Sequence, residues 1–274
     1  MKKFALLIIV SFYTLISFAL NPSREYAMLP SDFNIEYEEI DIPSTDDMTL
    51  KGWYFKPKVT SNKLIILSDD GDGNMADFME QIGLFLSLNY HVITYDYRGY
   101  GASSDFRIVN KFFTYAKFVD DLEAVISFSE KNYANIRRIS LYGLGIGAGL
   151  ATSIGCIHPK ISHIISDSPY TSFEDAKARI KEVKGEDVLL PIGHDKKKIE
   201  PKYALEQRAS TSKIKILYIN GSEDELCTSK DIKLLIKIRP ATSTSFTVKG
   251  ADGTNTYSTD KETYFAQVKE FLES

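Results

Sequence analysis

Short apolar strands alternate with amphipathic helices along this chain, and this alternation limits the fold more than any other feature. Residues 63–68 form a nearly continuous apolar run, which is typical of a strand buried on both faces of a parallel sheet, and residues 91–95 and 138–142 are also expected to be strands. Segments 75–88 and 112–128 lie between them and have helical spacing. Parallel strands joined by helices need right-handed crossovers, so the sequence predicts an α/β fold with a mostly parallel sheet.

The same alternation continues toward both ends of the chain. Residues 34–42 and 49–55 are expected to form two N-terminal strands joined by a turn. Residues 30–274 are therefore expected to form one domain. The more polar segment 172–201 is interpreted as a small cap-like insertion over the carboxyl edge of the sheet. The other predicted elements are strands at 162–166, 213–220 and 243–248, and helices at 148–157, 230–238 and around 264–272.

The composition excludes several classes of protein. Hydrophobic residues make up 43% and charged residues 26%, which is typical of a globular protein. The formal net charge is −4 and no long basic run is present, which argues against nucleic acid as a partner. Two cysteines, Cys156 and Cys227, are too few for a disulfide-rich scaffold. Whether they pair with each other stays open, because sequence does not place their Cα atoms.

The N-terminus predicts export. Lys2 and Lys3 precede an apolar run over residues 4–20, and the small residue Ala19 stands where a signal peptidase would cut. Residues 1–19 are therefore expected to be a secretory signal peptide or an uncleaved anchor. In both cases the body of the protein lies outside the cytoplasm. It is then periplasmic or secreted, or tethered to a membrane through residues 4–20.

The turns after the predicted strands carry the most specific residues, and sites in open α/β sheets form there. Residues 96–101 read DYRGYG, residues 167–172 read DSPYTS and residues 221–224 read GSED. In this order, these turns resemble the α/β-hydrolase superfamily, close to its small branch with an N-terminal signal or anchor and little lid. The resemblance implies an α/β-hydrolase fold, a sheet of about eight strands with helices on both faces. It also implies that Asp224 holds the position of the triad acid.

The nucleophile and base positions depart from the family pattern. The family reads G-x-S-x-G at the turn where residues 143–147 read GLGIG, so Gly145 stands at the nucleophile position. Gly253 stands at the position of the catalytic histidine, and none of the four histidines follows Asp224. Glycine has neither a hydroxyl group nor an imidazole ring, so these two positions cannot supply a nucleophile or a base.

The oxyanion turn departs as well. The family has H-G-N-x-G or a similar run here, and Asp70 replaces the histidine. The resemblance assigns the oxyanion turn to Asp70, Gly71 and Ile146. A carboxylate beside a developing oxyanion repels it, so Asp70 further weakens the predicted chemistry.

The sequence therefore predicts a pseudoenzyme that binds an unknown small molecule or a protein partner, but it leaves open whether the chain is an enzyme. One alternative is an active esterase or peptidase with a rearranged site. Its candidate groups are Ser103, Ser104, Ser168, Cys227 and His194, whose usual roles are structural.

A second alternative is a nucleotide site at Gly143–Gly149, which fits G-x-G-x-x-A, with Asp167 as the ribose acid. Asp70, Asp72 and Asn74 have the first spacings of a calcium loop, but the sixth and twelfth positions do not fit. The sequence thus predicts no cofactor and no metal.

Overall fold

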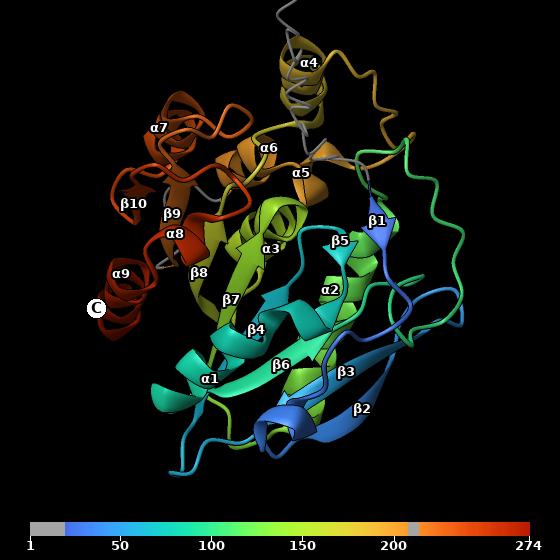
Figure 1. Ribbon diagram of the computed structural model, residues 1–274, viewed down its shortest axis with the longest axis vertical. Coiled ribbons are helices and arrows are strands. Elements are labelled where there is room, and N and C mark those ends of the chain that lie inside the picture. The colour runs from blue at the N-terminus through green and yellow to red at the C-terminus, as the bar shows by residue number, and fades with distance from the viewer. Residues whose placement is uncertain (1–19, 208–213) are drawn as a thin grey trace, which may run out of the picture.

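A central sheet organises the molecule. In a computed structural model of the protein, residues 20–207 and 214–274 are described (Figure 1). They contain an eight-stranded sheet of order β10-β9-β8-β7-β4-β6-β3-β2, with β10 at one edge and β2 at the other. Its strands are β2 (Glu38–Pro43), β3 (Thr49–Phe55), β4 (Lys63–Ser68), β6 (His91–Tyr95), β7 (Arg138–Leu144), β8 (Ile161–Asp167), β9 (Lys215–Gly221) and β10 (Ser243–Val248).

The strand directions confirm the predicted mostly parallel sheet. β2 and β3 form an antiparallel hairpin, and β3 also runs antiparallel to β6. The remaining neighbours pair in parallel. The α-helices are α1 (Met79–Ser87), α2 (Lys117–Asn132), α3 (Gly145–Ile157), α4 (Phe173–Lys184), α5 (Lys196–Ile199), α6 (Pro201–Glu206), α7 (Ser229–Ile238), α8 (Thr256–Thr259) and α9 (Lys261–Glu273). The short elements are β1 (Asn21–Pro22), η1 (Pro30–Phe33), β5 (Asp72–Gly73) and η2 (Met75–Phe78).

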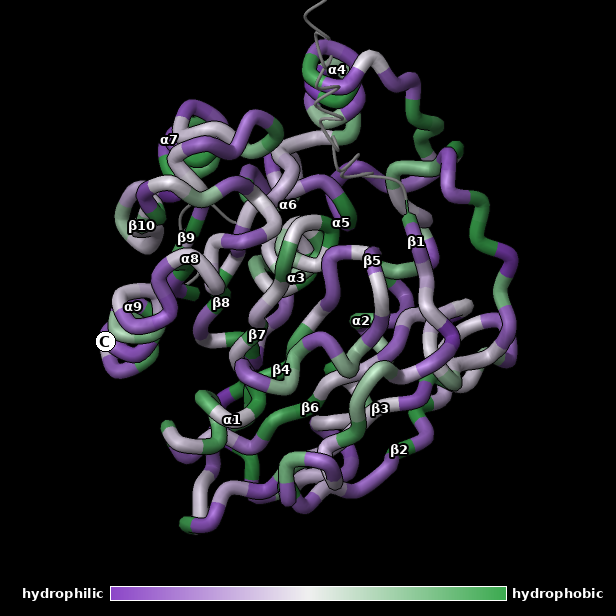
Figure 2. Tube along the Cα trace, viewed as in Figure 1, coloured by the Kyte–Doolittle hydropathy of each residue, from purple (hydrophilic) through white to green (hydrophobic). Residues whose placement is uncertain are grey.

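Helices cover both faces of the sheet, as the sequence predicts. Leu64 and Ile66 of β4 belong to the core that includes buried residues of α2, α3 and α7. Ile65 and Leu67 belong to the opposite core, which includes buried residues of α1 and α9. Alternate side chains of a strand point to opposite faces, so a strand covered on both sides must be apolar throughout. Figure 2 shows the same hydrophobic character along the central strand β6.

Two predicted helix boundaries are wrong. The helix expected over 112–128 begins only at Lys117, because Phe112 and Phe113 are used in tertiary pairing. Phe112 forms a parallel bridge with Leu189, and the Phe113 N–H donates to the Leu189 carbonyl (2.9 Å). The helix expected over 148–157 begins earlier, at Gly145.

Two other expectations concern the N-terminus and the cysteines. The predicted signal peptide or anchor over residues 1–19 lies outside the described residues. Among the helices that are described, none combines the length and the apolar character needed to cross a membrane. Cys156 and Cys227 are both buried and are not joined to each other by a disulfide bond.

Replacing Gly147 with alanine is expected to lower the free energy of unfolding by about 1–3 kcal/mol. A Cβ atom on Gly147 would lie 2.3 Å from the Ser68 carbonyl oxygen and 2.5 Å from that of Asp69. Both contacts are backbone atoms of β4 and its turn, so relief requires α3 to move away from the sheet. Urea unfolding followed by circular dichroism measures the change.

The matched control is Gly83→Ala in α1. A Cβ atom there has no neighbouring atom within 4 Å. Alanine has the higher helix propensity, so this variant is expected to be more stable than wild type by about 0.5–1 kcal/mol. Equal stability of the two variants would contradict the close packing of α3 on β4.

Candidate functional site

The turn between β7 and α3 keeps the backbone of a nucleophile elbow. Gly145 follows the last residue of β7 directly, begins α3 and has φ +48°, in the left-handed region. Gly143 packs tightly below it, since a Cβ atom there would lie 2.3 Å from the Gly147 carbonyl oxygen. Glycine adopts this left-handed conformation more readily than other residues do.

Asp70 lies beside Gly145, where a side chain at position 145 would begin. A Cβ atom on Gly145 would lie 2.9 Å from the Cβ atom of Asp70. The space where a serine side chain would begin is therefore restricted by the oxyanion turn itself. Burial raises the pKa of Asp70 to about 6, and the neighbouring carboxylate of Asp72 adds to this shift.

The N–H groups of the oxyanion turn already have acceptors within the turn. The Gly71 N–H donates to Asp69 Oδ1 (2.8 Å), and the Asp72 N–H donates to Asp70 Oδ1 (2.9 Å). An oxyanion hole needs N–H groups directed at the substrate oxygen. Here the N–H groups of Gly71 and Asp72 are directed at carboxylates instead.

The segment at residue 20 covers the same turn. β1 pairs in parallel with β5, which places Asn21 opposite Asp72. A Cβ atom on Gly71 would lie 2.9 Å from Leu20 Cδ2 and 3.1 Å from Ile146 Cδ1. Leu20 is buried, so it fills apolar space beside two positions of the predicted oxyanion turn, Gly71 and Ile146.

The structure brings the acid position and the histidine position together. Asp224 follows β9, and its Oδ1 accepts the N–H groups of Leu226 (2.9 Å) and Cys227 (2.8 Å). Its Oδ2 is buried and has no hydrogen-bond partner. A Cβ atom on Gly253 would lie 2.7 Å from this oxygen. The unpaired oxygen therefore borders the place where a side chain at position 253 would begin, and burial raises the pKa of Asp224.

A cavity of about 320 Å³ joins these parts of the site. Gly145 and Asp224 both line it, together with residues of α4 and α7, which lie at the same end of the molecule in Figure 1. Ser168 and Tyr170 of the DSPYTS turn also line it. This size falls at the lower end of the range for small-molecule pockets.

Ser168 has the most unusual backbone among the alternative nucleophiles. Its φ of +54° is rare for a residue other than glycine, and strained positions of this kind cluster at functional sites. Its hydroxyl group donates weakly to Asp167 Oδ1 (3.3 Å), and it also lies near enough to Asp224 to oppose the burial that raises the pKa of that carboxyl. The sequence predicts an ordinary turn residue at Ser168, because the backbone strain of a residue cannot be inferred from its type.

The remaining nucleophile and base candidates are held in structural contacts. Ser103 Oγ donates to the Asp96 carbonyl (2.8 Å), and Ser104 Oγ accepts the Thr49 N–H (2.9 Å). Cys227 lines the cavity, but burial raises the pKa of its thiol and disfavours the reactive thiolate.

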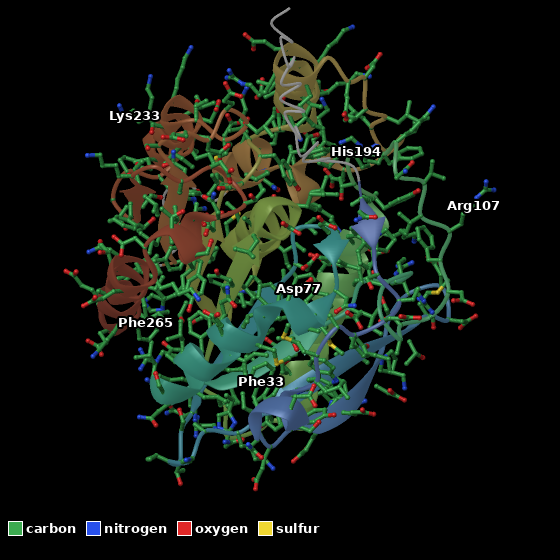
Figure 3. The ribbon with its side chains drawn as sticks, in the orientation of Figure 1. Phe33, Asp77, Arg107, His194, Lys233 and Phe265 are labelled. Atoms are coloured by element: carbon green, nitrogen blue, oxygen red, sulfur yellow. The ribbon has the colours of Figure 1, made fainter. Side chains whose placement is uncertain are left out.

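His194 also forms hydrogen bonds with residues close to it in the sequence. Figure 3 shows it in the upper part of the molecule, near the position of α5 in Figure 1. Its Nδ1 lies 2.9 Å from the Pro191 carbonyl oxygen, and its Nε2 lies 2.8 Å from Glu200 Oε1. Both ring nitrogens therefore have partners, and the structure does not bring this histidine to Asp224.

The glycine-rich turn serves packing, which weakens the case for a nucleotide site. A Cβ atom on Gly149 would lie 2.0 Å from the Tyr170 ring. Asp167, the expected ribose acid, is buried and accepts hydrogen bonds from the hydroxyl groups of Thr256 (2.6 Å) and Tyr264 (2.7 Å). Its carboxylate is already used inside the protein.

The buried carboxyl groups predict an unusual pH dependence of stability. Burial raises the pKa values of Asp70, Asp96 and Asp167 to about 6, whereas burial lowers the pKa of His163 to about 4. Between pH 7 and 5 the three acids bind protons in the folded state before they do in the unfolded chain, which favours folding. His163 has the opposite effect. The contribution of these four groups to the free energy of unfolding is therefore expected to rise by about 2 kcal/mol as pH falls from 7 to 5.

Urea unfolding at several pH values tests this expectation. Asp167→Asn should remove about 1 kcal/mol of the rise, because one of the shifted groups no longer titrates. Asp105→Asn is the control, since that carboxyl is 98% exposed. A stability that stays flat or falls over this pH range would contradict the burial of these acids.

Comparisons with known proteins agree with this architecture. A family model described as serine aminopeptidase, S33, matches residues 63–189. The α/β hydrolase domain-containing protein WAV2 of Arabidopsis thaliana is 25% identical over 56% of this chain, which spans about half (49%) of the WAV2 length. The uncharacterized protein YqkD of Bacillus subtilis is 27% identical over 85% of this chain and 78% of its own length. Protein bem46 of Schizosaccharomyces pombe is 25% identical over 78% of this chain and 69% of its own.

Solved structures show the same fold. The esterase Pf2001 of Pyrococcus furiosus superposes with a TM-score of 0.73 at 22% identity and covers 92% of this chain and 98% of its own. The acylaminoacyl peptidase of Pyrococcus horikoshii gives a TM-score of 0.69 at 15% identity, covering 87% of this chain and 41% of the peptidase. The protein therefore has the α/β-hydrolase fold, and its sequence similarities support a place in the α/β-hydrolase superfamily.

Proposed function

We propose that this protein is a pseudoenzyme with an α/β-hydrolase fold, which binds a ligand in its cavity and does not perform serine hydrolase chemistry. The observation that carries the proposal is Gly145. It keeps the left-handed backbone of the elbow, but it has no side chain and faces Asp70. Without an oxygen nucleophile at this point, no acyl-enzyme forms at the elbow.

The other two parts of the catalytic machinery support the same proposal. Asp224 has no imidazole to orient, since position 253 is glycine. The N–H groups of Gly71 and Asp72 are held by carboxylates of their own turn. Nucleophile, base and oxyanion stabilisation are thus weakened together, whereas the cavity between them persists.

We also propose that the segment 172–201 acts as a small cap on this cavity. Its helix α4 supplies Ala176, Arg179 and Ile180 to the lining. The predicted export of the protein is part of the same proposal. A ligand would then be captured outside the cytoplasm.

Ester turnover by the purified full chain tests the proposed function. Hydrolysis of p-nitrophenyl acetate is expected to be the same for wild type and for Asp224→Ala, within about twofold, because no catalytic group depends on this acid. Turnover that falls at least tenfold in Asp224→Ala would contradict the proposal.

A rearranged hydrolase centred on Ser168 is the second candidate. The strained backbone of Ser168 and its position in the cavity lining favour it over the other serines. This candidate predicts that Ser168→Ala abolishes any ester turnover while the fold is kept. The pseudoenzyme predicts that Ser168→Ala leaves the background rate unchanged.

A nucleotide-binding role makes a separate prediction. Millimolar NAD would raise the melting temperature of the protein if the turn at Gly143–Gly149 held a dinucleotide. Because these glycines and Asp167 are engaged in packing and internal hydrogen bonds, we expect no shift.

A further inference from the structure

The lining of the cavity includes a buried carboxyl group without a counter-charge. Asp224 is only 6% exposed, lines the cavity and has an Oδ2 atom without a hydrogen-bond partner. In the described part of the chain, no basic side chain forms an ion pair with it. An unpaired buried polar group costs free energy that a suitable partner recovers.

The basic side chains of the lining are placed differently. Arg179 lies 3.8 Å from Asp231 Oδ2, and Lys202 lies 3.7 Å from Asp175 Oδ2. The side chains in both pairs are 21–48% exposed, so these charges meet at the solvent side of the cavity. The charges of Arg179 and Lys202 are therefore offset by Asp231 and Asp175, whereas the buried carboxylate of Asp224 has no such ion pair in the described residues.

Other residues of the lining suit an apolar body. Phe113, Ile146 and Tyr170 are buried and line the cavity. The rings of Phe113 and Tyr170 pack edge to face with their centroids 5.3 Å apart. Aromatic rings attract cations as well as apolar groups, so they are compatible with an amine near Asp224.

We propose that the ligand of this cavity is an organic cation, a protonated amine on an apolar body of about the size of one ring and a short chain. The amine would lie toward Asp224, and the apolar body would pack on Phe113, Ile146 and Tyr170. This inference rests on the proposed function, because a catalytic histidine beside Asp224 would already satisfy the carboxylate.

Three matched probes test the charge preference by isothermal titration calorimetry on the full chain. They are 4-phenylbutylamine, 4-phenylbutanol and 4-phenylbutyrate, which share a body and differ in charge. The amine is expected to bind about tenfold more tightly than the alcohol, with the carboxylate weakest, because attraction to a carboxylate follows charge. A ligand held instead by the exposed Lys230 of the lining would reverse this order.

Asp224→Asn isolates the responsible group. Asparagine retains an oxygen for the N–H groups of Leu226 and Cys227, and it removes the charge. The preference for the amine over the alcohol is expected to fall to within about twofold. Asp252→Asn is the control, because Asp252 lies near enough to influence Asp224 but does not line the cavity. It should keep the tenfold preference.

The outcomes separate this inference from the proposed function. Equal binding of amine and alcohol to wild type overturns the inference even if Asp224→Asn fails to fold, and so does binding of none of the probes. A preference that survives in folded Asp224→Asn overturns it as well. Ester turnover dependent on Asp224 or Ser168 would overturn the pseudoenzyme, whatever the order of the three probes.

Discussion

Replacement of Asp121 by alanine is expected to lower the free energy of unfolding by about 3–5 kcal/mol. Arg98 and Asp121 are both 0% exposed, and the Arg98 side chain donates to Asp121 Oδ1 through Nε (3.0 Å) and Nη2 (2.6 Å). The Arg98 backbone N–H also donates to Asp121 Oδ2 (3.1 Å). Removing the carboxylate leaves a buried guanidinium group without its main partner, which is among the most destabilising changes known for a core.

Asp120→Ala is the matched control for Asp121→Ala. Asp120 is the preceding residue of α2, but its side chain is 29% exposed and pairs with Lys117 (3.1 Å). Its loss should cost less than about 1 kcal/mol. Urea unfolding measures both variants. A loss below about 1 kcal/mol for Asp121→Ala would mean that Asp46, which also contacts Arg98, compensates for the missing acid.

The double variant Gly145→Ser, Gly253→His is expected to stay at the background rate of ester hydrolysis, although it introduces the serine and the histidine of the family pattern at these positions. The new serine would begin 2.9 Å from Asp70 Cβ, so either the side chain or the oxyanion turn must shift. The turn N–H groups would still point at their own carboxylates. A misplaced nucleophile, together with an oxyanion turn that carries a carboxylate and has no free N–H donors at Gly71 and Asp72, is expected to reduce turnover by about 10⁴-fold or more relative to a well-formed triad.

Adding Asp70→Gly to the double variant tests whether the Asp70 side chain keeps the rate of ester hydrolysis low. This third change removes the clashing side chain and its charge, and it should raise the rate of the double variant by about 10²-fold. The kcat/KM for p-nitrophenyl acetate is the quantity to compare. Recovery of full activity in the double variant would show that Asp70 is not the obstacle that the geometry indicates.

The fold was largely predictable because its strands are marked by local composition. The run KLIILS at 63–68 is apolar on both faces, and β4 covers the same residues. Helix starts were less predictable, since they depend on distant parts of the chain. Phe112 is held by Leu189, which is far away in sequence, so helical spacing alone placed the start of α2 too early.

The spatial relations of the candidate site follow in part from the sequence. Asp70 lies against Gly145, and Asp224 lies against Gly253, as expected for turns at one edge of the sheet. The roles assigned to these residues stay predictions. The hydrogen bonds within the oxyanion turn could be predicted from the local sequence. Asp side chains often accept the N–H of the residue two positions later, as Asp69 does here.

Other features of the site had no local sign in the sequence. The strained backbone of Ser168 and the packing of Leu20 against Gly71 depend on tertiary contacts. The same holds for the contribution of α4 to the cavity. These contacts join segments that are far apart in the chain, so neither periodicity nor residue type could predict them.

Intact-mass measurement after incubation with a fluorophosphonate probe shows whether the protein carries an activated serine, because the probe forms a covalent adduct with such a residue. The protein is expected to show no increase in mass under conditions that label a control serine esterase completely. A stoichiometric adduct on any serine, and on Ser168 in particular, would contradict the claim that this hydrolase fold lacks a nucleophile.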